Sequence, residues 1–226
     1  MKKICLFLSC FIFLYGYGRV YAEDTLSAVP RRTESRRITD TGPAPGNFSR
    51  EAVTSERETG SAALHETFIR QAFALAISAA KKGNHPFGAL LVHNGKVILT
   101  SENTVNTDND FSRHAEINLL VRAKRELPPE MLRRSTMYTS TAPCMTCCSA
   151  MMYRGVGKIV FGVSYDAFAK LTGFRDTDIP CDRLYRSAGK PVEWIGPILE
   201  REGLEVFRFW PEGDPNSKNF LKNPKQ

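Results

Sequence analysis

The stretch SRHAEINLL, residues 112–120, places a histidine and a glutamate two positions apart at the predicted start of a helix. A regular helix turns by about 100° per residue, so side chains two positions apart point in nearly opposite directions. His114 and Glu116 can face one site only if the histidine precedes the regular turns, where the backbone need not follow the helical rotation. We therefore expect the imidazole to bind a metal and the carboxylate beside it to move protons.

A second stretch, STAPCMTCCSAMM at residues 140–152, supplies two more metal ligands. Cys144 and Cys147 are three residues apart, so they share one face of a helix. Both lie in its first turn, where free N–H groups and the helix dipole favour thiolates. A catalytic zinc takes three protein ligands and one open position, and His114 is the predicted third ligand. A Cys-x-x-Cys pair alone is equally typical of a redox pair or half of a disulfide framework. The zinc assignment therefore depends on this pair together with His114 and Glu116.

The surrounding pattern predicts strands that alternate with helices after an initial hairpin. Asn94-Gly95 between two apolar runs is a strong hairpin signal. Hairpin, strands and helices in this order favour an α/β domain with a mixed sheet covered on both faces. Helices are predicted over residues 62–82, 114–127, 144–154 and near 197–203, strands over 87–93, 96–101, 135–140, 158–164 and 192–195, and a short apolar run at 204–210.

The two ends of the chain have other patterns. Residues 1–22 combine two lysines, a short apolar run and VYA, which is typical of a secretory signal peptide and short for a membrane span. This predicts a secreted or periplasmic protein, with an uncleaved anchor, an organellar or a cytoplasmic location as alternatives. Residues 23–60 have few large apolar side chains and are predicted to be a disordered linker. The predicted domain covers residues 61–212, and residues 213–226 form a C-terminal tail.

The net charge of +7 raises the question of nucleic acid binding. Basic residues gather at positions 122–134, and a solvated surface is the favoured interpretation over a patch that contacts an RNA backbone. The C-terminal segment contains three prolines and no compact arginine-rich helix, which lowers the expectation of an RNA partner. We therefore expect a small-molecule partner, although nucleic acid remains an alternative.

The pattern H-A-E followed by P-C-M-T-C resembles the zinc-dependent cytidine deaminase-like superfamily. Within it, HPFGALLV, Asn103 and FSRHAE resemble the guanine and nucleoside deaminases, with the tRNA adenosine deaminases as a second branch. The resemblance implies a three-layer α/β/α sandwich around a mixed five-stranded sheet, and a homodimer. It also implies zinc held by His114, Cys144 and Cys147, Glu116 as the proton shuttle, and substrate contacts from Asn103, Phe87 and Ala115.

The resemblance implies zinc-dependent hydrolytic deamination of a purine base or nucleoside such as guanine or guanosine, with release of ammonia. One alternative is a deaminase of tRNA adenosine, cytosine or cytidine. Another is an exported, non-catalytic protein that binds zinc and nucleobases. The sequence departs from the family in having Ala142 where many purine-acting relatives have glutamate. Cys148 is expected to be a small core residue, and Cys181 can be core, free or part of a lid.

Overall fold

The computed structural model describes the backbone of residues 50–173 and 180–213, and side chains from residue 61 onward. The predicted signal peptide, residues 23–49 of the predicted linker and residues 214–226 of the predicted tail lie outside the described residues. Within the described part, no helix has both the length and the apolar character needed to cross a bilayer.

The centre of the fold is a five-stranded mixed sheet with the order β2-β1-β3-β4-β5. β1 is antiparallel to both β2 and β3, whereas β3, β4 and β5 are parallel. Asn94 and Gly95 both have positive φ, 50° and 71°, as the predicted tight hairpin turn requires. The strands are β1 (Gly88–His93), β2 (Lys96–Glu102), β3 (Thr136–Thr141), β4 (Lys158–Val163) and β5 (Glu193–Ile195).

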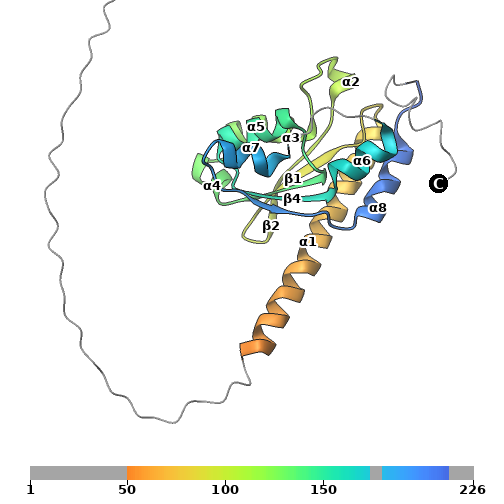
Figure 1. Ribbon diagram of the computed structural model, residues 1–226. Coiled ribbons are helices and arrows are strands. Elements are labelled where there is room, and N and C mark those ends of the chain that lie inside the picture. The colour runs from red at the N-terminus through yellow and green to blue at the C-terminus, as the bar shows by residue number, and fades with distance from the viewer. Residues whose placement is uncertain (1–49, 174–179, 214–226) are drawn as a thin grey trace, which may run out of the picture. The chain divides into compact units, whose positions relative to one another are not determined.

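Helices cover both faces of the sheet, which confirms the predicted three-layer α/β/α arrangement (Figure 1). One face carries α3 (Ala115–Glu126), α4 (Pro129–Arg133), α5 (Met145–Arg154) and α7 (Cys181–Ser187). The other face carries α1 (Arg50–Lys81), α6 (Tyr165–Thr172), α8 (Glu200–Leu204) and the 3-10 helix η1 (Glu205–Phe209). A single turn, α2 (Val105–Asp108), lies between β2 and α3.

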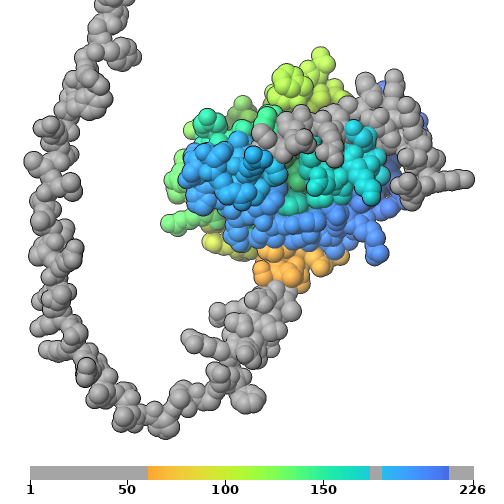
Figure 2. Space-filling model, viewed as in Figure 1, coloured from red at the N-terminus to blue at the C-terminus, as the bar shows by residue number. Residues whose placement is uncertain are grey.

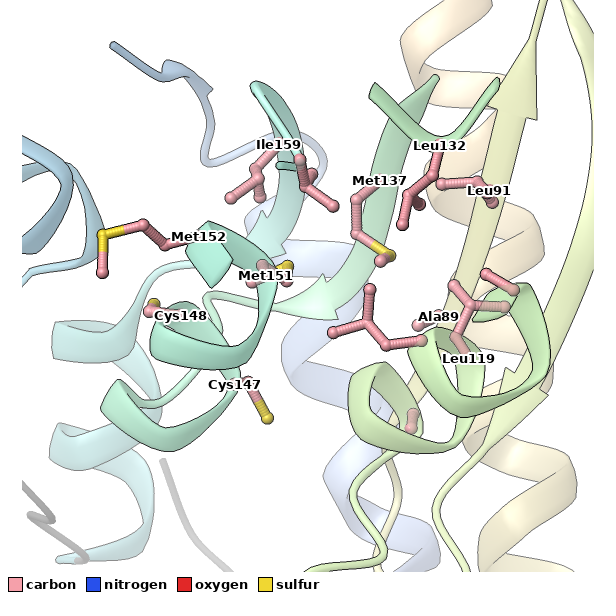
Figure 3. Close-up of a cluster of buried hydrophobic side chains, with 14 of the residues drawn as sticks. Ala89, Leu91, Leu119, Leu132, Met137, Cys147, Cys148, Met151, Met152 and Ile159 are labelled. Atoms are coloured by element: carbon pink, nitrogen blue, oxygen red, sulfur yellow. The ribbon is translucent and has the colours of Figure 1, made fainter. Parts of the chain in front are cut away.

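The apolar strands β1, β3 and β4 divide their side chains between these two layers. In β1, Ala89 and Leu91 join the core beneath α3 and α5, and Leu90 and Val92 join the core against α1. Successive strand side chains point to opposite faces, so a strand covered on both sides needs a continuous apolar run. Figure 3 shows the α3 and α5 side of this core, where Ala89, Leu91 and Met137 of the sheet meet Leu119 and Met151 of the helices.

The first helix begins earlier than the sequence predicted. α1 starts at Arg50, so residues 50–60 of the predicted linker are helical. The prediction used the shortage of large apolar residues, which measures how much surface a segment can bury. Helix formation depends instead on propensity, and alanine, arginine and glutamate in REAVTSERETG favour it.

Four helices were not expected, α2, α4, α6 and α7, and the last three have a recognisable start. Pro129 opens α4 at a position where a missing N–H costs no helical hydrogen bond, so the proline pair that ends one helix also begins another. Ser164 caps α6 by accepting a hydrogen bond from the N–H of Ala167. α7 begins at Cys181, directly after Pro180.

Cys148 and Cys181 form a disulfide bond between α5 and α7. Both residues are buried, at 0% and 2% exposure, so the predicted core position of Cys148 is confirmed. The disulfide itself was not predicted, because it depends on the chain fold, which brings the two Cα atoms to 5.5 Å across a sequence separation of 33 residues.

The contact between α1 and the start of β1 leaves no room for a side chain at Gly88. An added Cβ there would lie 2.5 Å from the carbonyl oxygen of Ala72 and 2.7 Å from the backbone nitrogen of Ala76. Gly88→Ala must push α1 away from the sheet, and we expect it to lower the free energy of unfolding by about 1–3 kcal/mol. Gly157→Ala is the matched control, because a Cβ at Gly157 meets no atom within 4 Å. Urea unfolding of both variants checks this, and equal stabilities would contradict it.

Candidate functional site

Two helices begin side by side in the fold, each with a chemically capable residue at its N-cap. His114 occupies the N-cap position of α3 with φ −65° and ψ 152°, and Cys144 occupies the N-cap position of α5 with φ −68° and ψ 168°. Both backbones are extended at these positions, so neither residue follows the helical rotation. This is the arrangement expected from SRHAEINLL, and it allows His114 and Glu116 to face one site.

His114, Cys144 and Cys147 form a compact cluster. The Nδ1 atom of His114 lies 3.6 Å from Cys144 Sγ and 3.4 Å from Cys147 Sγ. All potential ligand atoms of the three residues lie within 4.8 Å of one another. Around a tetrahedral zinc with ordinary bond lengths, a nitrogen and a sulfur ligand are about 3.5 Å apart. The cluster therefore has the spacing and the donor types of a zinc site with three protein ligands.

The electrostatics of the cluster favour a bound cation. A hydrogen bond from Cys147 is the main cause that lowers the pKa of the Cys144 thiol to about 4. The same hydrogen bond, together with burial, raises the pKa of the Cys147 thiol. Without a cation the site thus holds one thiolate and opposes a second. A divalent metal removes this penalty, so both thiols can ionise and bind it.

Glu116 stands beside the metal cluster without belonging to it. Its Oε2 atom lies 3.5 Å from Cys147 Sγ, and the residue is 7% exposed. Burial is the main cause that raises the pKa of its carboxyl group, and the positive charge of His114 opposes the rise. A carboxyl group with a raised pKa next to a metal cluster is suited to take up and return protons.

A hydrogen-bonded loop holds His114 at the start of α3. Asp110 Oδ1 accepts from the N–H of Ser112 at 2.9 Å and from its hydroxyl at 2.6 Å. Asn118 Nδ2, one turn into α3, donates to the carbonyl oxygen of Glu102 at 3.0 Å and to Thr104 Oγ1 at 2.9 Å. These bonds join the loop to the end of β2. Sequence reasoning did not identify Asp110, Ser112 or Asn118 as residues that position the metal ligand.

A pocket of about 370 Å³ opens over the cluster and includes Glu116, His114 and Cys144 in its wall. Aromatic rings make up much of the remaining wall. Trp210 packs edge-on against Phe87, with ring centres 5.7 Å apart, and stacks on His85 at 5.1 Å. The aromatic lining residues are Phe87, Phe111, Tyr165, Phe168 and Trp210.

The three predicted substrate contacts occupy different positions. Phe87 lines the pocket and also packs against Phe168, so it serves both pocket and core. Asn103 is 1% exposed, and its Oδ1 accepts from the N–H of Val105. Its buried Nδ2 has no hydrogen-bond partner in the described part of the chain, and Asn103 is not among the residues that line the pocket. The Ala115 side chain is fully buried in the core and is absent from the pocket wall.

Sequence reasoning missed most of the far wall of the pocket. Tyr165 and Phe168 come from α6, which directly follows β4. β3 and β4 are parallel, so the segments after them leave the same edge of the sheet, and this rule could have identified α6. Trp210 has no comparable signal, because it reaches the pocket from a short helix near the end of the described chain.

Comparison with known proteins agrees with this geometry. Residues 62–163 match the family described as the cytidine and deoxycytidylate deaminase zinc-binding region. The chain is 32% identical over 158 residues to the Schizosaccharomyces pombe protein named "Probable cytosine deaminase", covering 65% of this chain and 92% of that protein. It is 35% identical over 151 residues to the guanine deaminase of Bacillus subtilis, covering 65% of this chain and 93% of that protein.

A solved structure from work on tRNA:A34 deaminases superposes with a TM-score of 0.52 and 25% identity. The superposition covers 62% of this chain and 98% of that one. These relatives are named for three different substrates, so they agree on the class of reaction and differ on its target. With the zinc-binding region matched and His114, Cys144 and Cys147 positioned to bind a metal, the chain belongs to the cytidine and deoxycytidylate deaminase family.

Proposed function

We propose that the protein hydrolytically deaminates a purine base or nucleoside of the guanine type and releases ammonia. The observation that carries this proposal is the buried Glu116 carboxyl group 3.5 Å from a cysteine of the candidate zinc cluster, at the floor of an aromatic pocket. A structural zinc site usually has four protein ligands and needs no adjacent acid. The three-residue cluster with an adjacent carboxyl group favours an enzyme over a binding protein.

His114, Cys144 and Cys147 would hold the zinc. When bound, zinc supplies a Lewis acid that activates a water molecule as a nucleophile near neutral pH. Glu116 first accepts a proton from that water, because its carboxylate adjoins the metal cluster. It would then donate this proton to a ring nitrogen of the base, take the remaining proton from the hydroxyl group now on the ring carbon, and pass it to the leaving amine, which departs as ammonia. Its raised pKa suits a group that must be both base and acid in one turnover.

The pocket wall suits a flat aromatic substrate. The rings of Phe87, Phe168 and Trp210 pack against one another at angles, which leaves a stiff apolar surface. Such surfaces bind planar rings by stacking and by exclusion of water.

The basic residues on α3 and α4 give little support to an RNA substrate. Arg122 is already used within the domain, since it pairs with Glu126 at 3.0 Å and donates to the carbonyl oxygen of Thr100 at 2.6 Å. Arg122 lies near the C-terminal end of α3, whereas the candidate site is at its N-terminal end. A small substrate therefore fits the distribution of charge better.

One observation favours tRNA adenosine deamination as a second candidate. Phe111 lines the pocket yet is 87% exposed, so its ring is available at the pocket entrance. Exposed aromatic rings of this kind stack on the unpaired bases of single-stranded RNA loops. The likeness to a solved tRNA:A34 deaminase agrees with this candidate.

Glu116→Gln should abolish most activity and leave the metal in place. The amide keeps the size of the side chain but cannot accept or return a proton, so we expect kcat to fall by about 10²–10⁴-fold or more. Glu126→Gln is the matched control, because Glu126 lies at the exposed end of the same helix. Steady-state kinetics and zinc analysis check this, and near-normal turnover of Glu116→Gln would refute the shuttle role.

Removal of the thiol ligands should remove the metal. We expect about one zinc per chain in the purified protein and almost none in Cys144→Ala plus Cys147→Ala, because two of the three ligands are then lost. Ser149→Ala, on the same helix, should keep its zinc. Elemental analysis gives the answer directly, and equal zinc content in all three proteins would show that the metal is bound elsewhere.

The salt dependence of turnover separates the two candidate substrates. A neutral base or nucleoside neutralises no phosphates, so its kcat/KM should change little between about 50 and 200 mM salt, whereas a tRNA substrate should lose orders of magnitude. The assay uses guanine, guanosine, adenine, adenosine, cytosine, cytidine and an anticodon stem-loop. Salt-insensitive deamination of a purine is expected. Efficient, salt-sensitive deamination of the stem-loop alone would establish the second candidate instead.

A further inference from the structure

The Cys148–Cys181 disulfide joins the helix that carries the metal cluster to a short neighbouring helix. Cys148 directly follows the candidate ligand Cys147 in α5, and Cys181 is the first residue of α7. We propose that this disulfide protects the metal centre: it occupies the one extra thiol next to the cluster, so that Cys144 and Cys147 stay available for zinc during folding in an oxidising compartment. This inference rests on the proposed role of Cys144 and Cys147 as zinc ligands.

The number of cysteines agrees with a division into two candidate metal ligands and one disulfide pair. The chain contains six, of which Cys5 and Cys10 lie in the predicted signal peptide. Removal of that peptide would leave four: the candidate metal pair and the disulfide pair. No thiol would be left over. Disulfides persist in secreted and periplasmic proteins, which is the environment that the predicted signal would provide.

If Cys148 had no disulfide partner, its thiol could form a disulfide with one of the two candidate metal ligands. Cys144, Cys147 and Cys148 lie within five consecutive residues, so Cys144 can meet either of the other two in an unfolded chain. A disulfide that included Cys144 or Cys147 would destroy a metal ligand. In the folded protein, Cys147 and Cys148 leave α5 in different directions (Figure 3), and Cys148 meets Cys181 instead.

The disulfide also lies against the first turn of α5, which carries Cys144 and Cys147. The Sγ atom of Cys148 lies 3.4 Å from the carbonyl oxygen of Pro143, directly before Cys144. The N–H of Cys148 donates to the carbonyl oxygen of Cys144 at 2.9 Å. The start of α5 is therefore held by this backbone hydrogen bond, and the disulfide sulfur of Cys148 lies in contact with the residue before Cys144.

α7 depends on two anchors, of which only one is a disulfide. It has seven residues, too few for a helix to be stable by itself. At its far end the Tyr185 hydroxyl donates to the carbonyl oxygen of Val156 at 2.9 Å. Figures 1 and 2 show α7 beside α5 and at the surface of the domain. Tyr185 thus offers a way to weaken α7 without changing any thiol.

The oxidation is an ordinary thiol–disulfide exchange. Cys148 and Cys181 each give up one hydrogen as their sulfur atoms join, and a small disulfide such as oxidised glutathione is reduced to two thiols. Zinc takes no electrons in this step. The thiols of Cys144 and Cys147 take no part in this step, so both remain free to bind zinc.

The test compares four full-length proteins that all carry Cys5→Ser and Cys10→Ser and are refolded with zinc and oxidised glutathione: the otherwise wild-type protein, Cys181→Ala, Cys148→Ala plus Cys181→Ala, and Tyr185→Phe. We expect wild type to hold about one zinc and a mapped Cys148–Cys181 bond. Cys181→Ala should lose most of its zinc, because oxidised glutathione can join the unpaired Cys148 to Cys144 or Cys147 and is itself reduced to two thiols. The double variant should keep its zinc while its Tm falls by about 5–15 °C. Tyr185→Phe should keep both zinc and the disulfide.

Elemental analysis, mass spectrometry of unreduced peptides and thermal unfolding give these values without an activity assay. Equal zinc content in Cys181→Ala and the double variant would overturn the protective role, as would free Cys148 and Cys181 thiols in wild type. A wild type without zinc would overturn the metal assignment and this inference with it. Failure of the proposed substrate would leave all of these measurements unchanged.

Discussion

The candidate site depends on the meeting of two helix N-termini, those of α3 and α5. His114 and Cys144 each occupy an N-cap with extended backbone, and Cys147 and Glu116 come from the first turns that follow. An N-cap side chain is free of the helical rotation, so it can point along the helix toward a ligand placed before the first turn. Each helix thus supplies two side chains to one point, and the dipoles of both helices favour the thiolates and carboxylate gathered there.

The sheet makes this meeting possible. β1 runs between β2 and β3, so the loop that carries His114 leaves β2 near the edge where β3 leads into Cys144. The apolar strands fill both faces, and the contact of Gly88 with the backbone of α1 keeps the layers close. α3 and α5 pack on the face of the sheet opposite α1, so the placement of the two helix starts depends on the core beneath α3 and α5.

Burial of the ionisable groups disfavours the charged forms of Cys147 and Glu116, and it also makes Glu116 suited to proton transfer. Two thiols and a carboxyl group lie within hydrogen-bonding range in a largely buried place, which raises the pKa of Cys147 and of Glu116. A cation would relieve this for the thiols. The Glu116 carboxyl group would still border an apolar, aromatic pocket, where a proton can be held or released at modest cost. The disulfide beside the cluster keeps the sulfur of Cys148 bonded to Cys181, so that this sulfur does not react with Cys144 or Cys147.

Local sequence determined much of the fold and the central cluster. Asn94-Gly95 defined a hairpin and apolar runs defined the strands, because each of these signals lies within a few consecutive residues. The HAE and PCMTC motifs together indicated a zinc site, although His114 and Cys144 are 30 residues apart. The early start of α1 was missed, since burial rather than helix propensity was used to judge it. Only the tertiary structure paired Cys148 with Cys181 and brought Trp210 to the pocket. Those contacts join segments far apart in sequence, and their physical basis is the packing of whole helices on the sheet, which no local pattern of residues encodes.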